Sequence, residues 1–208
     1  RPDRLHPSSI GAGIMARKIG DYILNDGTTS QTDFIPTQST PFNFHGYQGY
    51  DFRTEGISCK IVKPRKEAKG RPWVWRARFW DLLEHGFHIA YCEVADLYGS
   101  DKAIEHWNKF YQFMTAHGFH QKPVLEGMSR GGLIVYNWAA RNTDKVACIY
   151  ADAPVMDIKS WPMGKGAYTG SKQDIERMLK AYGFDSEEEA TNWKGNPLDH
   201  AARIAQAR

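Results

Sequence analysis

The sequence has few cysteines and no long apolar run, and each shortage excludes a class of protein. Among 208 residues there are only three cysteines, an odd and widely spaced set that provides neither a disulfide framework nor a metal-binding spacing. Cys59, Cys92 and Cys148 each lie in a short, strand-like apolar stretch, which predicts buried free thiols. No apolar run approaches the roughly 18 to 20 residues that a membrane-spanning helix needs, so we expect no membrane partner.

The chain also lacks an excess of charge of one sign. Its 27 Lys and Arg residues are interspersed with 24 Asp and Glu residues, and the net charge is only +3. Without a basic stripe we expect no nucleic-acid partner, and we expect no metal or cofactor. Apolar residues make up 41% of the chain and aromatic residues 13%, which is ample for a packed core. The chain starts at Arg1 without a leader-like segment, so we expect a processed or truncated product.

Composition divides the chain into three parts. Residues 1–25 end in a helical pattern, and residues 26–41 are rich in Thr, Ser, Gln, Gly and Pro, which predicts a linker. In residues 42–208, two strands are expected around a turn at Glu55 and Gly56. Beyond them, strands at 72–75, 88–95, 122–127 and 146–152 alternate with helices at about 79–85, 101–117 and 131–142. This alternation predicts an α/β fold with a mostly parallel sheet covered by helices on both faces.

The strongest local motif is Gly-x-Ser-x-Gly, formed by Gly127, Ser129 and Gly131 between a predicted strand and a predicted helix. So tight a turn strains the serine backbone and exposes its Oγ, and the glycines leave room for the crossing. A further glycine, Gly132, allows close packing of the helix. Ser129 is therefore predicted to be a nucleophile, with the N–H of Arg130 as an oxyanion donor. A Gly- and Ser-rich turn that merely starts a helix is the alternative.

From about residue 42 to the end, the chain resembles the α/β-hydrolase family, with PWVWRARF, GFHIAYCEVADLYGS and LEGMSRGG similar to bacterial esterase-like members. The resemblance implies a second oxyanion donor in the loop after PWVW, at Ala77 or Arg78. Family members commonly have His-Gly there, and this sequence departs from that pattern. Arg76 and Arg78 can bind a substrate carboxylate in bidentate fashion, or they are solvated loop arginines.

The family order places an acid and then a histidine after the serine. Asp152 and Asp157 follow the last predicted strand and are candidate acids in an early position, or else ordinary loop or capping residues. His200, in a predicted helix, is the only downstream histidine. We therefore expect the chain to end before the strand that carries the acid, with the sheet incomplete. Residues 155–195 are polar and helical in pattern, which predicts a cap-like segment.

The first 25 residues carry a second motif. Asp3 and His6 are spaced so that the carboxylate can fix the imidazole tautomer. The string resembles the last conserved block of the SGNH (GDSL-like) hydrolases, except that Arg4 replaces a usual glycine; the residues that fit are Asp3, His6, Pro7, Gly11, Met15 and Ala16. On that resemblance His6 is a catalytic base with Asp3 as its partner, and residues 1–25 are the C-terminal tail of such a domain. A composite triad of these two residues with Ser129 is the less orthodox interpretation.

Two functional hypotheses follow. The tandem order resembles bimodular bacterial enzymes that remove ester groups from decorated polysaccharides, which implies a serine esterase acting through an acyl-enzyme on a small-molecule or polysaccharide ester. That analogy implies a periplasmic or secreted parent protein. The alternative is a catalytically inactive carbohydrate-binding module in which Trp73, Trp75, Trp80 and Trp161 stack on sugar rings. Because Trp73 and Trp75 alternate within a predicted strand, at least one of them is expected in the core.

Overall fold

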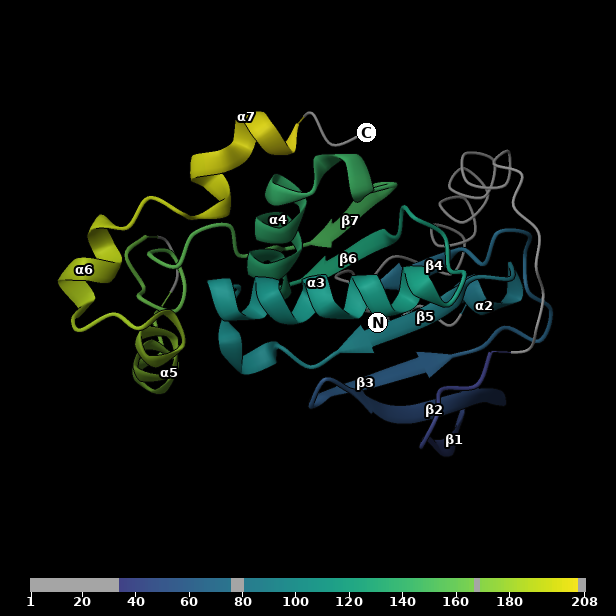
Figure 1. The fold of residues 1–208 in the computed structure, drawn as a ribbon. Coiled ribbons are helices and arrows are strands. Elements are labelled where there is room, and N and C mark those ends of the chain that lie inside the picture. The colour runs from purple at the N-terminus through teal and green to yellow at the C-terminus, as the bar shows by residue number, and fades with distance from the viewer. Residues whose placement is uncertain (1–33, 76–80, 167–168, 206–208) are drawn as a thin grey trace, which may run out of the picture. The chain divides into compact units, whose positions relative to one another are not determined.

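The computed structural model describes residues 34–75, 81–166 and 169–205. Figure 1 shows the strands and helices of this part of the chain. The strands are β1 (Thr40–Phe44), β2 (Tyr47–Thr54), β3 (Ile57–Val62), β4 (Trp73–Trp75), β5 (His88–Cys92), β6 (Val124–Met128) and β7 (Cys148–Asp152). The α-helices are α2 (Asp81–Glu84), α3 (Asp101–Ala116), α4 (Gly131–Arg141), α5 (Lys172–Tyr182), α6 (Glu187–Asn192) and α7 (Ala201–Ile204). Short 3-10 helices are η1 (Ala95–Leu97), η2 (Thr143–Lys145) and η3 (Pro197–His200).

The seven strands form one sheet in the order β1-β2-β3-β5-β4-β6-β7. Strands β1, β2, β3 and β5 pair antiparallel, whereas β4 pairs parallel with both β5 and β6. After β3 the chain passes the position that β5 later fills and forms β4, and the connection from β4 back to β5 is the crossover between parallel strands. The sheet is thus mixed, with its parallel part leading to the Gly-x-Ser-x-Gly motif, and the α/β class predicted from the sequence is confirmed.

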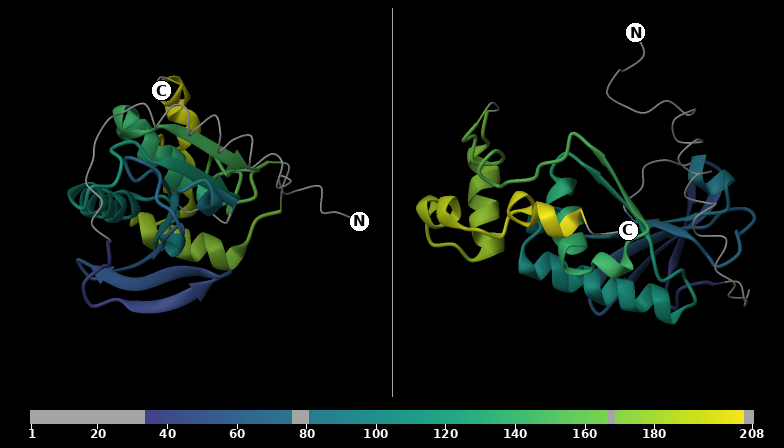
Figure 2. Two further views of the ribbon diagram at one scale, coloured as in Figure 1. Left: turned by 90° about the vertical axis from the view of Figure 1, so that its right-hand side faces the viewer. Right: turned by 90° about the horizontal axis from the view of Figure 1, so that it is seen from above.

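Helices cover both faces of the antiparallel strands. Successive strand residues point to opposite faces, so Phe52 and Val62 lie on different sides of the sheet. Phe52 contacts rings of α3, with 5.2 Å between its centroid and that of Phe113. Val62 packs with Ile89 and with Leu83 of α2 on the other face. The predicted hairpin at Glu55 and Gly56 is also present, between β2 and β3. Figure 2 shows the ribbon from two further sides.

The described end of the predicted linker contacts a buried part of the fold. Phe34 is buried, with its ring centroid 5.2 Å from that of Phe119, and β1 already begins at Thr40. Strand β1 is a difference from the expected elements, because a Thr- and Pro-containing stretch gives no clear alternation. Its pairing with β2 is what orders it. Residues 1–33, which include half of that linker and the Asp3–His6 motif, lie outside the described residues.

The thiols are free, as predicted from the cysteine spacing. Cys59 and Cys92 face each other directly across β3 and β5, and both side chains are buried. Cys148 in β7 is only half-buried, and burial raises the pKa of its thiol to about 11. The two opposed cysteines therefore pack as small apolar side chains in the interior of the sheet.

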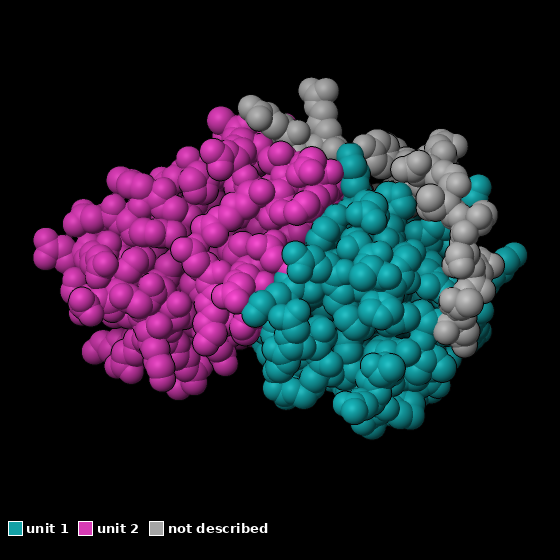
Figure 3. Space-filling model, viewed as in Figure 1, with its two compact units in different colours: residues 1–93, 109–125 teal, residues 94–108, 126–208 magenta. Residues whose placement is uncertain are grey.

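The chain divides into two compact units, coloured separately in Figure 3. Unit 1 comprises residues 1–93 and 109–125, and unit 2 comprises residues 94–108 and 126–208. Helix α3 and strand β6 each contribute residues to both units. Unit 1 contains strands β1 to β5, and unit 2 contains the end of β6, the Gly-x-Ser-x-Gly turn and all that follows.

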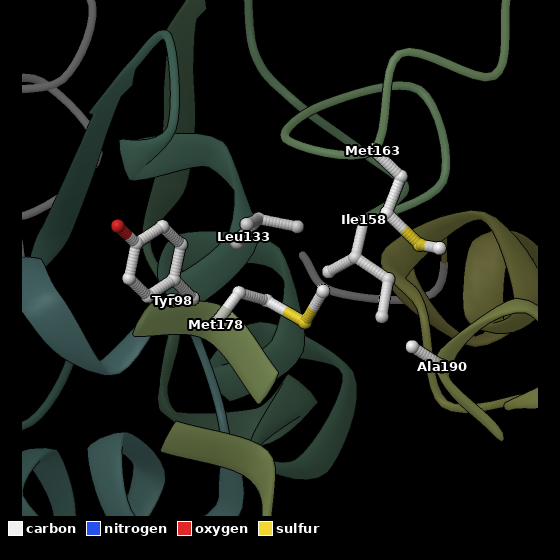
Figure 4. Packing of buried hydrophobic residues seen from close by; sticks show 6 residues of the cluster. All are labelled: Tyr98, Leu133, Ile158, Met163, Met178 and Ala190. Carbon is white, nitrogen blue, oxygen red and sulfur yellow. The ribbon is translucent and has the colours of Figure 1, made fainter. Parts of the chain in front are cut away.

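Unit 2 has its own apolar core, shown in Figure 4. Leu133 of α4 lies beside Met178 of α5, and Ile158 lies near Ala190 of α6. The residues 155–195, expected to be a polar cap-like segment, therefore contribute buried side chains as well as an exposed surface. Helix α5 has clear ends, since Ser171 accepts a hydrogen bond from the N–H of Asp174 and Gly183 closes it with a φ of 74°.

Candidate active site

Ser129 lies on the turn between β6 and α4, with a φ of +52° and an exposed side chain. This left-handed conformation costs a residue other than glycine roughly 1–2 kcal/mol, so surrounding contacts must hold it. A strained, exposed serine between a strand and a helix is the nucleophile-elbow geometry. The backbone form predicted from the motif is therefore present in the structure.

Three backbone hydrogen bonds hold Ser129 in this conformation. Its N–H donates to the carbonyl oxygen of Asp152, 3.0 Å away at the end of β7. Its carbonyl oxygen accepts from the N–H groups of Gly132 and Val155, each at 2.9 Å. The N–H and the carbonyl group of Ser129 are thus both fixed, and its side chain has no hydrogen-bond partner among the described residues.

The glycines around Ser129 permit close crossings. A Cβ on Gly132 would lie 2.6 Å from Cβ of Pro154 and 2.7 Å from the carbonyl oxygen of Val155. A Cβ on Gly127 would lie 3.2 Å from the carbonyl oxygen of Gly131, a tighter approach than most side chains make. Gly132 therefore permits the close helix packing that the sequence predicted, against the loop that follows β7.

The start of α4 presents free N–H groups beside the serine. Arg130 has helical angles, with φ of −56° and ψ of −18°, and precedes the first helical residue. Within the part of the chain that the structure describes, the N–H groups of Arg130 and Gly131 have no acceptor. Unpaired N–H groups at a helix N-terminus carry partial positive charge and favour a developing oxyanion. This placement suits the donor role predicted for Arg130.

The side chain of Arg130 is held by residues that the sequence did not single out. Its Nη1 lies 3.6 Å from a carboxylate oxygen of Asp96 and 3.9 Å from one of Asp174. The guanidinium also lies over the ring of Tyr98, 5.7 Å from its centroid. Two carboxylates therefore lie within ion-pair distance of Arg130, next to the residue predicted to be the nucleophile.

Tyr98 and Asp174 connect this cluster to the cap-like segment. The Tyr98 hydroxyl donates to Oδ1 of Asp174 at 2.6 Å, and the Ser171 hydroxyl donates to Oδ2 at 2.6 Å. These two donors, Ser171 first, hold the pKa of Asp174 below its usual value. Burial, reinforced by the neighbouring carboxylate, raises the pKa of Tyr98 to about 12. Asp174 is thus an anion and Tyr98 a neutral donor at neutral pH.

No acid and base are assembled at Ser129 among the described residues. No hydrogen bond joins Ser129 Oγ to any side chain in that part of the structure. Asp152 bonds Ser129 only through its backbone carbonyl. Asp157 accepts from the N–H of Lys159 at 2.8 Å and pairs with that lysine's Nζ at 3.3 Å, which is the loop-capping alternative. His200 ends η3 and is half-buried.

Several predicted site residues cannot be placed. The candidates Asp3, His6, Arg76, Ala77 and Arg78 lie outside the described residues. Their roles as base, partner, oxyanion donors and carboxylate ligand stay predictions. The SGNH-like tail of residues 1–25 stays a prediction for the same reason.

Two of the four tryptophans that the binding-module hypothesis requires are internal. Trp73 and Trp75 are 0% exposed, and their ring centroids lie 5.1 Å apart. Trp161 is half-buried and stacks on Tyr98 with 6.0 Å between centroids, while Trp80 lies outside the described residues. Core packing therefore accounts for Trp73 and Trp75, and neither is available to stack on a sugar.

The described residues contain neither a metal-binding cluster nor a membrane-spanning helix. No group of three or more His, Cys, Asp and Glu side chains there is arranged to hold a metal ion. None of the helices in the described ranges has the length and apolar character needed to cross a membrane.

Comparison with known proteins gives structural likenesses only. No protein-family model matches the sequence, and no curated protein matches it significantly. An esterase of the bacterial hormone-sensitive lipase family is 11% identical with a TM-score of 0.49, over 88% of this chain and 72% of that one. An S-formylglutathione hydrolase from Agrobacterium tumefaciens is 14% identical with a TM-score of 0.49, over 81% and 75%. A cold-adapted esterase from an Arctic intertidal metagenomic library is 12% identical with a TM-score of 0.45, and the match covers 54% of this chain and 61% of that one. The match thus spans less than two thirds of that last esterase.

Proposed function

We propose that the protein is a serine carboxylic-ester hydrolase in which Ser129 forms an acyl-enzyme. The observation that carries this proposal is the exposed Ser129 side chain at a φ of +52°, directly before the N–H groups of Arg130 and Gly131, which have no acceptor among the described residues. A glycine would adopt this conformation without strain, so the presence of a serine there favours a role for its hydroxyl.

In the proposed reaction, Ser129 Oγ attacks the ester carbonyl carbon while its proton passes to a histidine base. The carbonyl oxygen becomes an oxyanion, which the N–H of Arg130 stabilises, and the alcohol leaves with a proton from the same histidine. Water then attacks the acyl-enzyme, which releases the acid and restores the serine. The histidine is a requirement of the proposal, because none of the described residues supplies it to Ser129.

Ester decorations of carbohydrates are the proposed substrates. The tandem resemblance of residues 1–25 and 42–208 to polysaccharide-directed esterases supports this choice. Arg76, beside the proposed oxyanion donors Ala77 and Arg78, would add a carboxylate contact for an acidic sugar. A secreted or periplasmic parent protein belongs to the same proposal, as does an SGNH-like site using His6 and Asp3.

Labelling with a fluorophosphonate ester, followed by peptide mapping, tests the proposal. The probe is applied to this chain and to the longest encoded form of the protein, each as wild type and as Ser129→Ala. We expect the longest form to be labelled at Ser129 and the variant to remain unlabelled, with Ser58→Ala as a matched control on another exposed serine. Labelling of this chain by itself that disappears in His6→Ala would instead support the composite triad.

Absence of labelling in both forms would overturn the esterase proposal. The inactive carbohydrate-binding module would then be the remaining hypothesis. It would have to act without Trp73 and Trp75, since both are buried in the core.

A further inference from the structure

Unit 1 has a polar cavity of about 500 Å³ on one face of its antiparallel strands. The cavity lies on the sheet face that α2 covers farther along the same strands, where Val62 and Ile89 are buried. Its residues come from β1, β2, β3 and β5 and from the chain directly before β1 and after β5, and Figure 1 shows these strands side by side. The volume is within the range of roughly 300 to 1,000 Å³ that small-molecule sites occupy.

A row of directly opposed side chains crosses the cavity. Thr40 lies opposite Asp51, Asp51 opposite Lys60, and Lys60 opposite Tyr91, on four neighbouring strands. Lys60 and Asp51 form an ion pair. Because each group projects from a strand with fixed register, their spacing is set by the backbone rather than by flexible loops.

A second polar row lies beside the first. Arg53 is opposite Ser58, and its Nη1 donates to the serine Oγ at 3.1 Å. Glu93 continues this row, since its N–H donates to the carbonyl oxygen of Ser58 at 2.9 Å. The Tyr91 hydroxyl donates to the Glu93 carboxylate at 2.8 Å, which joins the two rows. Donors and acceptors are thus interleaved on one rigid surface.

The charges in the cavity indicate the kind of ligand. The two cations, Arg53 and Lys60, are matched by two carboxylates, Asp51 and Glu93, and the other lining residues are uncharged. A ligand with a net charge would meet as much repulsion as attraction there. An uncharged molecule with many hydroxyls can both donate to the carboxylates and accept from the cations. The half-buried ring of Tyr91 adds an apolar surface of the kind on which sugar rings stack.

We propose that this cavity binds a sugar ring of a neutral oligosaccharide. The site uses residues of unit 1 alone and is independent of Ser129, so it does not rest on the esterase proposal. If both proposals hold, the protein contacts a carbohydrate through a surface that takes no part in ester cleavage.

Amide-detected NMR titration of the chain tests the binding. The probes are xylohexaose, mannohexaose and cellohexaose, with tri-galacturonic acid as an anionic comparison. We expect at least one neutral hexaose to shift the amide signals of β2, β3 and β5 around Asp51, Lys60 and Tyr91, and the anionic trimer to leave them unchanged. Tyr91→Ala should weaken the binding by about tenfold, the loss of one aromatic contact.

Charge and control variants make the test sharper. The double variant Asp51→Asn, Lys60→Gln keeps hydrogen-bonding groups and removes both charges, so it should still bind a neutral sugar. Thr54→Ala, on the opposite face of β2, and Ser129→Ala should bind as the wild type does. The proposal is overturned if no neutral hexaose shifts these signals, if only the anionic trimer does, or if Tyr91→Ala binds unchanged. Fluorophosphonate labelling of Ser129 is expected to be the same with and without Tyr91→Ala.

Discussion

At the scale of single residues, Ser129 has a left-handed backbone conformation that residues with a Cβ rarely adopt. Its φ of +52° suits glycine, and three backbone hydrogen bonds keep a serine there. Local strain of this kind persists only where the surrounding structure determines it. We therefore expect the serine at this position to lower the stability of the fold while it exposes a hydroxyl group.

Replacing Ser129 measures the cost of its backbone conformation. Ser129→Gly should be more stable than Ser129→Ala by about 1 kcal/mol, because glycine adopts the left-handed conformation without a Cβ clash. Both variants lack the hydroxyl, so the comparison isolates the backbone. Urea unfolding of the two variants at pH 7 measures the difference. Equal stability, or a more stable alanine variant, would contradict the strain inferred from the dihedral angle.

The elbow was predictable from sequence, whereas the cluster around it was not. Gly127, Ser129 and Gly131 are two residues apart and carry their geometry in the motif itself. Tyr98 and Asp174 are 76 residues apart, and neither belongs to a recognisable pattern. Tertiary packing brings such residues together, so no local spacing indicates their hydrogen bond.

At the scale of elements, α5 is docked to the rest of unit 2 by a polar contact as well as by Met178. Asp174, in its first turn, accepts from Ser171 and from Tyr98. The Tyr182 hydroxyl at the other end of the helix donates to the carbonyl oxygen of Tyr98 at 2.9 Å. Both ends of α5 are thus tied to the same tyrosine, which also lies beside Arg130.

Loss of the Tyr98 hydroxyl should alter the alkaline stability. The folded pKa of Tyr98 is raised to about 12, above its ordinary value near 10. The stabilisation that the neutral Tyr98 hydroxyl gives to the folded state is therefore complete below pH 10, and it is lost as the pH rises from about 10 to 12. Tyr98→Phe should lower the free energy of unfolding by about 1 kcal/mol at pH 7. Between pH 10 and 12 the variant should then lose less stability than the wild type does.

Urea midpoints at pH 7, 10 and 11 measure this effect. Tyr50→Phe, in β2, is the matched control, and it should keep the wild-type pH dependence. Part of the alkaline loss will remain in every variant, because burial also raises the pKa of Tyr182. A Tyr98→Phe profile parallel to that of the wild type would argue against the Tyr98–Asp174 bond.

Most elements between β2 and β7 followed from the alternation of apolar runs and helical patterns. The helices expected at 101–117 and 131–142 are α3 and α4, and the hairpin turn lies at Glu55 and Gly56 as predicted. Strand β1 was missed, because Pro41 and the polar residues before it indicate a loop. Proline is tolerated there since β1 is at the end of the strand order, where a missing N–H costs no ladder bond.

At the scale of the whole molecule, two compact units share continuous elements. Both α3 and β6 run from one unit into the other. A helix or strand that loses its packing on one side exposes backbone and apolar groups along its whole length. We therefore expect the two units to unfold together.

A substitution in one core examines this coupling. Met178→Ala removes a fully buried side chain of unit 2 and should lower the free energy of unfolding by about 2–5 kcal/mol. Tryptophan fluorescence and far-UV circular dichroism should still give one coincident transition. Glu176→Ala, an exposed change in the same helix, should leave the midpoint near that of the wild type. Two separated transitions in Met178→Ala would show that the units unfold independently.

Alkylation of the opposed thiols of β3 and β5 reports the rate at which the sheet opens. Cys59 and Cys92 are shielded in the folded chain, and a thiol must reach solvent before it can be alkylated. A molecule labelled at both positions is therefore one whose β3–β5 ladder has separated. Peptide mapping by mass spectrometry, which separates alkylation of Cys59 and Cys92 from that of the half-buried Cys148, would give the rate of that separation without a substitution in the chain.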